Sequence, residues 1–134
     1  MTDAASERAS LGSRIGVLAF AFLMGVLFGA VGTVGHRHEL AIGEVVLPWG
    51  IVAALVGVAG LLIGVRVMAG GRLVAGAAAA GVIGTVSLLS LPGAGGSVLI
   101  PGGVTGTIWA VGPALIAVLV VAWPSLPTVR RDRA

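Results

Sequence analysis

One short segment between two apolar stretches carries both histidines and two of the five carboxylates of the chain. Imidazole and carboxylate groups bind zinc and similar divalent metals, so His36, His38 and Glu39 form a candidate metal site. The pattern is weak, because an H-x-H pair sets no spacing to a third or fourth ligand. The sequence therefore favours the alternative, which is a solvated loop in which Arg37 pairs with Glu39 or Glu44.

The rest of the sequence offers few groups for catalysis. The chain has no cysteine, which removes thiolate nucleophiles, cysteine-ligated metals and disulfides. No ionisable residue lies in the middle of the long apolar segments, where such residues mark transport paths. The polar groups there are hydroxyls that can bond to a carbonyl of their own helix, namely Thr33, Thr85, Ser87 and Thr107. The sequence thus predicts no catalytic residue, no cofactor and no enzymatic activity.

The composition indicates that most of the surface faces lipid. The chain of 134 residues is long enough for one domain, and 57% of its residues are hydrophobic while 10% are charged. A soluble domain usually has about 25% charged residues. The eight basic residues are all arginines, and they flank apolar segments as topology signals, not as a nucleic-acid surface. We therefore expect a lipid bilayer as the principal partner and no nucleic acid.

Four apolar segments are long enough to cross a bilayer, because about 20 helical residues cover the roughly 30 Å hydrocarbon core. They are apolar on all sides and do not alternate as barrel strands would, so helices are expected. The predicted fold class is an all-α, integral membrane four-helix bundle with up-down-up-down topology. The expected spans are residues 15–35, 45–67, 73–91 and 105–123, within a domain of residues 15–124 that lies between a disordered tail (1–14) and a basic tail (125–134).

A cleaved signal peptide is the alternative interpretation of the first span. Arg8 and Arg14 would form its basic region, and Ala30-Val31-Gly32 resembles a cleavage site with small residues. The apolar segment is longer than the usual stretch of about 7–15 residues in a signal peptide. An uncleaved span is therefore favoured.

The arginines predict the direction of threading. Seven of the eight lie in the N-terminal segment, the turn between spans 2 and 3, and the C-terminal tail, whereas only Arg37 lies in a segment on the other side. Basic residues near span ends stay in the cytoplasm. We therefore expect a multi-pass protein with both termini cytoplasmic. The seven are Arg8, Arg14, Arg66, Arg72, Arg130, Arg131 and Arg133.

Two further patterns concern the ends and faces of the spans. Trp49, Trp109 and Trp123 lie near span ends, where tryptophan anchors helices at the lipid headgroups.

Small residues one turn apart allow helices to pack closely in lipid. Packing within the chain is favoured over a dimer interface, because the motif is weak in a chain with 23 glycines. The candidate packing residues are Gly25, Gly29, Gly60, Gly64, Ala77 and Gly81.

Three short motifs carry a resemblance to a known group of proteins. They are Gly-Ala-Val-Gly-Thr-Val-Gly-His at 29–36, Leu-Pro-Trp-Gly at 47–50 and Leu-Pro-Gly at 91–93. With these motifs the chain resembles, over residues 15–124, an uncharacterised family of small four-span membrane proteins from high-GC Gram-positive bacteria. The resemblance implies a bacterial inner (plasma) membrane setting and implies no mechanism.

These observations favour a non-enzymatic accessory or scaffold subunit of a membrane complex. A small oligomeric transporter or channel is one alternative, and it requires a specific homo-oligomer because four spans rarely enclose a path. An outward-facing metal or ligand sensor that uses His36, His38 and Glu39 is another. The expected partner is accordingly a membrane protein or a second copy of the chain.

Overall fold

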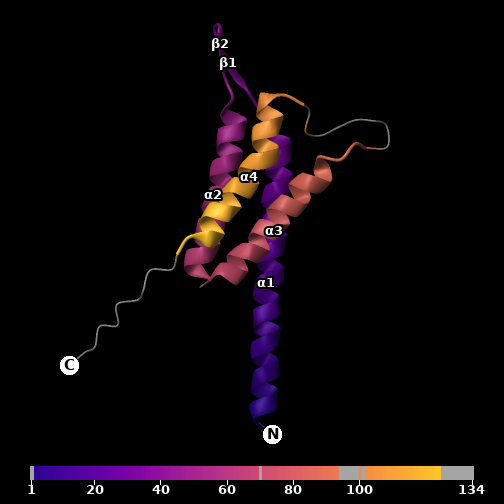
Figure 1. The fold of residues 1–134 in the computed structure, drawn as a ribbon, viewed down its shortest axis with the longest axis vertical. Helices are drawn as coiled ribbons and strands as arrows, with labels where there is room; N and C mark the ends of the chain where they lie inside the picture. The colour runs from indigo at the N-terminus through magenta and orange to yellow at the C-terminus, as the bar shows by residue number, and fades with distance from the viewer. Residues whose placement is uncertain (1, 70, 94–99, 101, 125–134) are drawn as a thin grey trace, which may run out of the picture.

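The computed structural model describes residues 2–69, 71–93, 100 and 102–124. Helices make up most of this part, and a short two-stranded hairpin joins the first two of them (Figure 1). In chain order the elements are α1 (Thr2–Gly35), β1 (Leu40–Ile42), β2 (Val45–Leu47), α2 (Trp49–Met68), α3 (Arg72–Leu89) and α4 (Val104–Ala122).

Within the described residues, four helices are long and apolar enough to cross a membrane. Large apolar side chains cover their outer surfaces, for example Phe20 in α1, Val56 in α2 and Leu119 in α4. Such surfaces suit lipid better than water, and helices satisfy their backbone hydrogen bonds internally. The prediction of four membrane-length helices is therefore confirmed, and these are the properties of a multi-pass membrane protein.

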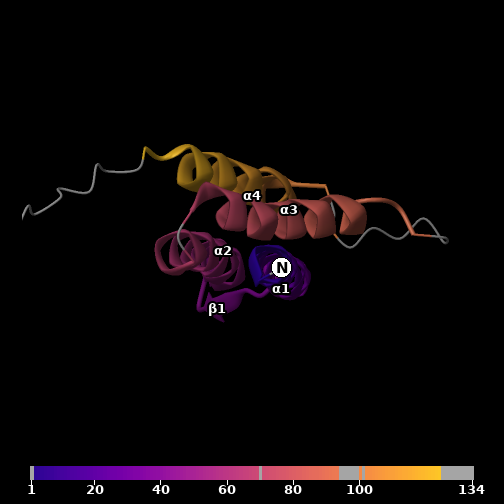
Figure 2. The same ribbon diagram turned by 90° about the horizontal axis from the view of Figure 1, so that it is seen from below.

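The helices lie in two layers, with α1 beside α2 and α3 beside α4 (Figure 2). The hairpin and the start of α4 lie at one end of the molecule, whereas the end of α2 and the start of α3 lie at the other (Figure 1). We call these the hairpin end and the arginine end, because Arg66 and Arg72 belong to the second one. The N-terminal turns of α1 extend beyond the arginine end (Figure 1).

Two boundaries differ from those expected from the sequence. The second span was expected from residue 45, but α2 begins at Trp49. Pro48 precedes it, and Val45–Leu47 forms strand β2 instead. β-branched residues favour strands, and proline has no N–H to donate inside a helix, so the apolar stretch divides at this point.

The N-terminal segment also differs from the expectation of disorder over residues 1–14. In the structure α1 begins at Thr2 and continues without a break into the membrane span. The Ser6 hydroxyl donates a hydrogen bond to the carbonyl of Asp3 at 2.8 Å. Extending an existing helix adds one hydrogen bond for each residue fixed, which is much easier than starting a new helix. The predicted basic tail, residues 125–134, lies outside the described residues.

The closest helix contact joins α1 to α3. A Cβ atom at Gly25 would overlap the carbonyl oxygen of Ala78, and one at Gly81 would overlap the carbonyl oxygen of Phe22. Gly29 lies one turn further along α1, where a Cβ would be 3.0 Å from the Thr85 side chain. The absence of side chains at these glycines therefore allows the two backbones to touch.

The other candidate packing residues behave differently. Ala77 is partly buried and packs against the core. Gly60 and Gly64, by contrast, have no described atom within 4 Å of an added Cβ, so this pair does not pack against another of the described helices. Gly60 and Gly64 therefore have no partner of the expected kind among the described residues, whereas Gly57 of the same helix lies against the Phe28 ring of α1.

Candidate functional site

The hairpin between α1 and α2 exposes a group of large apolar side chains at its end of the molecule. The two strands pair antiparallel, with Leu40 opposite Leu47 and Ile42 opposite Val45. Gly43 has φ of +65°, a turn conformation that glycine adopts readily. The hairpin points away from the helices (Figure 1). Its five large apolar side chains are each more than half exposed: Leu40, Ile42, Val45, Val46 and Leu47.

Backbone contacts at the base fix the direction of the hairpin. The N–H of Gly50 donates to the carbonyl of His38 at 3.0 Å, and the N–H of His38 donates to the carbonyl of Gly35 at 3.1 Å. A Cβ at Gly50 would lie 2.8 Å from the His38 carbonyl oxygen, so only glycine fits here. The end of α1 and the start of α2 therefore hold both arms of the hairpin.

His36 lies just below this base and is buried. Its side chain is 1% exposed, and Nδ1 is 2.7 Å from the carbonyl oxygen of Thr33. A carbonyl oxygen only accepts hydrogen bonds, so Nδ1 carries a proton and donates it. Nε2 is buried and has no hydrogen-bond partner among the described residues. The imidazole thus belongs to the interior of the bundle.

Trp109 of α4 completes this interior cluster. Its ring is parallel to that of His36, with an angle of 10° between the planes and 5.7 Å between the centroids. The indole N–H donates to Oγ1 of Thr33 at 3.0 Å, and that hydroxyl donates to the carbonyl of Gly29 at 2.7 Å. An added Cβ at Gly32 would overlap the indole ring. One polar chain and one stacked pair therefore join α4 to the end of α1.

This arrangement corrects the role expected for Trp109. The side chain was expected to lie in the lipid headgroup region, but it is 0% exposed. Trp49 and Trp123 are 48% and 65% exposed, so both are placed where they could face lipid. A buried indole needs a hydrogen-bond acceptor, and Thr33 provides it. Thr33 and Thr107 bond to carbonyls of their own helices, as expected.

The structure does not assemble the candidate metal site. Among the described residues no group of three or more metal-ligating side chains lies close enough to hold an ion. His36 is buried against Trp109, whereas His38 is exposed and lies beside Trp49 with 5.8 Å between ring centroids. Glu39 is exposed at the start of the hairpin. The two imidazoles have different neighbours because His36 directly follows α1 and its N–H still donates to the carbonyl of Gly32, while the chain has turned towards the hairpin at His38.

Removing the Thr33 hydroxyl tests the importance of the polar chain. Thr33→Val keeps the shape of the side chain and leaves the buried indole N–H of Trp109 without an acceptor. We expect the free energy of unfolding to fall by about 1–3 kcal/mol. The matched control is Thr107→Val, because Thr107 is exposed and its hydroxyl donates to the carbonyl of Gly103 in the same turn. Denaturation in mixed micelles should show almost no change for the control, and equal losses would contradict a special role for Thr33.

At the arginine end, side chains from α2 and α3 bind the end of α4. Nη1 of Arg66 donates to the carbonyls of Val120 and Val121, the latter at 3.0 Å, and Nη2 donates to the carbonyl of Trp123. Nη2 of Arg72 donates to the same Trp123 carbonyl at 3.3 Å. Carbonyls at a helix C-terminus lack helical partners and carry partial negative charge. Sequence reasoning interpreted these arginines only as topology signals and missed this contact.

Comparison with known proteins gives no match, since no family model, no curated protein and no solved structure matches the chain significantly.

Proposed function

We propose that the chain is a multi-pass protein of the bacterial inner membrane, threaded up-down-up-down with both termini in the cytoplasm. The bias of arginines towards one side of the spans supports this threading. Arg66 and Arg72 lie at the end from which the N-terminal turns of α1 project (Figure 1). The hairpin then lies on the outer side of the membrane.

We further propose that the protein is a non-enzymatic accessory subunit whose hairpin binds an apolar segment of a partner protein outside the membrane. The exposed hairpin is the observation that carries this proposal. Leu40 and Val45 point to one face of the two-stranded sheet, while Val46 points to the other, so both faces are apolar. A two-stranded hairpin is also only marginally stable by itself in water.

The energetic case for a partner follows from the exposed area. Fully burying one Val, Leu or Ile side chain contributes about 1.5–3 kcal/mol, so covering five half-exposed ones would contribute on the order of 5 kcal/mol. The outer edges of β1 and β2 have unpaired backbone groups that an added strand could bind. The backbone hydrogen bond between Gly50 and His38 holds the base of the hairpin in place. A partner would therefore bind the hairpin in the position that the structure shows.

Site-specific photocrosslinking tests this proposal. A photoreactive amino acid at Val46 should give one discrete protein adduct in native membranes, and Ile42→Asp on the opposite strand should lower its yield at least roughly tenfold, because a buried carboxylate is costly. The matched control is the same amino acid at Val56 of α2, which is similarly exposed on the side of a helix and should react with lipid.

Two outcomes would contradict the accessory role. Lipid adducts alone at Val46 would show that the hairpin lies on the bilayer. Adducts of the chain with itself would instead support a homo-oligomer, which a small transporter requires. The open space beside Gly60 and Gly64 on α2 favours this second candidate function, an oligomeric transporter. Small residues with free space beside them allow a helix of another copy to approach closely.

A further inference from the structure

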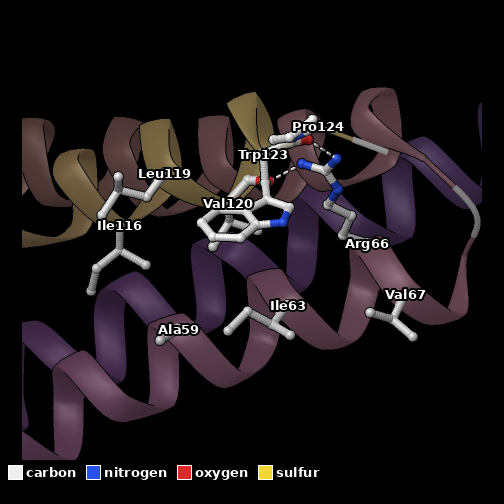
Figure 3. A pocket seen from close by; sticks show the side chains of 9 residues that line it. All are labelled: Ala59, Ile63, Arg66, Val67, Ile116, Leu119, Val120, Trp123 and Pro124. Atoms are coloured by element: carbon white, nitrogen blue, oxygen red, sulfur yellow. Dashed lines mark hydrogen bonds between the residues drawn. The ribbon is translucent and has the colours of Figure 1, made fainter. Parts of the chain in front are cut away.

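A groove between α2 and α4 lies at the arginine end, away from the hairpin. Its volume is about 700 Å³. Figure 3 shows side chains of α2, including Ala59 and Ile63, facing Ile116 and Leu119 of α4 across this space. Ile63 and Leu119 are both more than half exposed, so the groove opens on the outer surface of the helices. In a membrane, that surface faces lipid chains.

One end of the groove carries positive charge. The Arg66 guanidinium and the indole of Trp123 lie there together (Figure 3). Arg72 lies close enough to share the Trp123 carbonyl with Arg66. Each guanidinium has five N–H donors, so the carbonyl contacts with described residues leave further donors on both side chains. Tryptophan and arginine at a span end mark the level of the lipid headgroups.

No carboxylate of the same helices offsets this charge. The sequence has no Asp or Glu from Val45 to Pro124, and this range contains α2, α3 and α4. The described acidic residues of α1, Asp3 and Glu7, belong to the turns near its N-terminus. Backbone carbonyls stabilise a guanidinium but leave its net charge in place. A charge near hydrocarbon that no carboxylate of the described residues compensates is costly, so an anion at this position would be favoured.

We propose that the groove binds an anionic phospholipid. One acyl chain lies along Ala59, Ile63 and Ile116, and the phosphate accepts hydrogen bonds from Arg66 and Arg72. The planar guanidinium suits phosphate oxygens, and basic pockets between membrane helices bind anionic headgroups in this way. The groove extends from Ala59 to Val67 of α2, which is about 12 Å at 1.5 Å per residue. This length accommodates part of one acyl chain below a headgroup.

Fluorescence quenching by brominated lipids tests the proposal in the full chain. A Trp49→Phe background leaves two tryptophans. Trp109 is buried away from lipid, whereas Trp123 lines the groove, so quenching reports on the groove. Brominated phosphatidylglycerol should quench Trp123 at about 30-fold lower mole fraction than brominated phosphatidylcholine. This factor follows because each of the two arginines contributes about 1 kcal/mol to binding an anionic lipid, and 1.4 kcal/mol corresponds to a tenfold change in affinity. Equal quenching by the two lipids would overturn the proposal.

Three variants separate lipid binding from damage to the fold. Arg72→Gln removes one charge but leaves the Arg66 bonds to α4, and it should reduce the preference roughly fivefold. Ala59→Leu fills the groove without changing charge and should weaken quenching by both lipids. Arg37→Gln, at the hairpin end, should leave the preference unchanged. An unaltered preference in Arg72→Gln, or unaltered quenching in Ala59→Leu, would also overturn the proposal.

Discussion

Gly81→Ala is expected to destabilise the protein more than any other single-methyl change on α3. The new Cβ would overlap the carbonyl oxygen of Phe22 and lie 2.9 Å from the backbone N of Val26. Both neighbours are backbone atoms of α1, which cannot rotate away as a side chain can. The two helices would have to separate, and the contact at Gly25 would be lost with them. Overpacking of this kind costs about 1–3 kcal/mol, with larger values where backbones must move.

The matched control lies one turn away on the same helix. Gly84 has no atom within 4 Å of an added Cβ, so Gly84→Ala brings only the better helix propensity of alanine. That substitution should stabilise the protein by up to about 1 kcal/mol. Reversible unfolding in mixed micelles should therefore give shifts of opposite sign for the two variants. Shifts of the same sign would show that α1 and α3 do not touch at Gly81.

Trp109→Ala is expected to have the largest effect of any side-chain truncation. The indole is completely buried, stacks on His36 and donates to Thr33, so its removal leaves a cavity and an unfilled acceptor. Replacing a buried tryptophan by alanine costs about 3–5 kcal/mol, which is a large part of the usual stability of a domain. We expect poor recovery of folded protein in detergent and a strongly lowered melting temperature.

Two comparisons identify the cause of this loss. Trp109→Phe keeps an aromatic ring and loses the N–H, so it should be clearly milder than Trp109→Ala. Trp49→Ala removes an indole that is 48% exposed, and it should cost much less. A loss for Trp49→Ala as large as that for Trp109→Ala would mean that Trp109 is no more important to the interior than a surface tryptophan.

The sequence predicted the helices well because a bilayer sets a physical length for each span. The length rule located α3 and α4 with ends close to those of the structure, and it located the end of α1 at Gly35 but not its start at Thr2. It failed at Val45–Leu47, because an apolar strand next to an apolar helix forms one continuous hydrophobic stretch. Only Pro48 indicates where that stretch divides.

The candidate site was harder to predict, because the direction of a side chain is not encoded in an evenly apolar helix. Trp109 near a span end gives the same pattern whether the ring faces lipid or a neighbouring helix. His36 and His38 are two residues apart, yet the chain turns away from α1 directly after Gly35, and the two rings lie beside different tryptophans. The bonds from Arg66 to α4 join residues 54 or more positions apart, so only the packing of the helices brings them together.

The continuity of α1 has a mechanical consequence. The helix has 34 residues and no proline, so it forms one continuous rod of about 51 Å. Its second half is fixed by the backbone contacts at Gly25 and Gly29 and by the base of the hairpin at His38. Its first half, up to Val17, has no buried side chain among the residues whose exposure is described. A force on the N-terminal turns would therefore act as a lever on the second half of the helix, where the contacts with α3 at Gly25 and Gly29 would resist it.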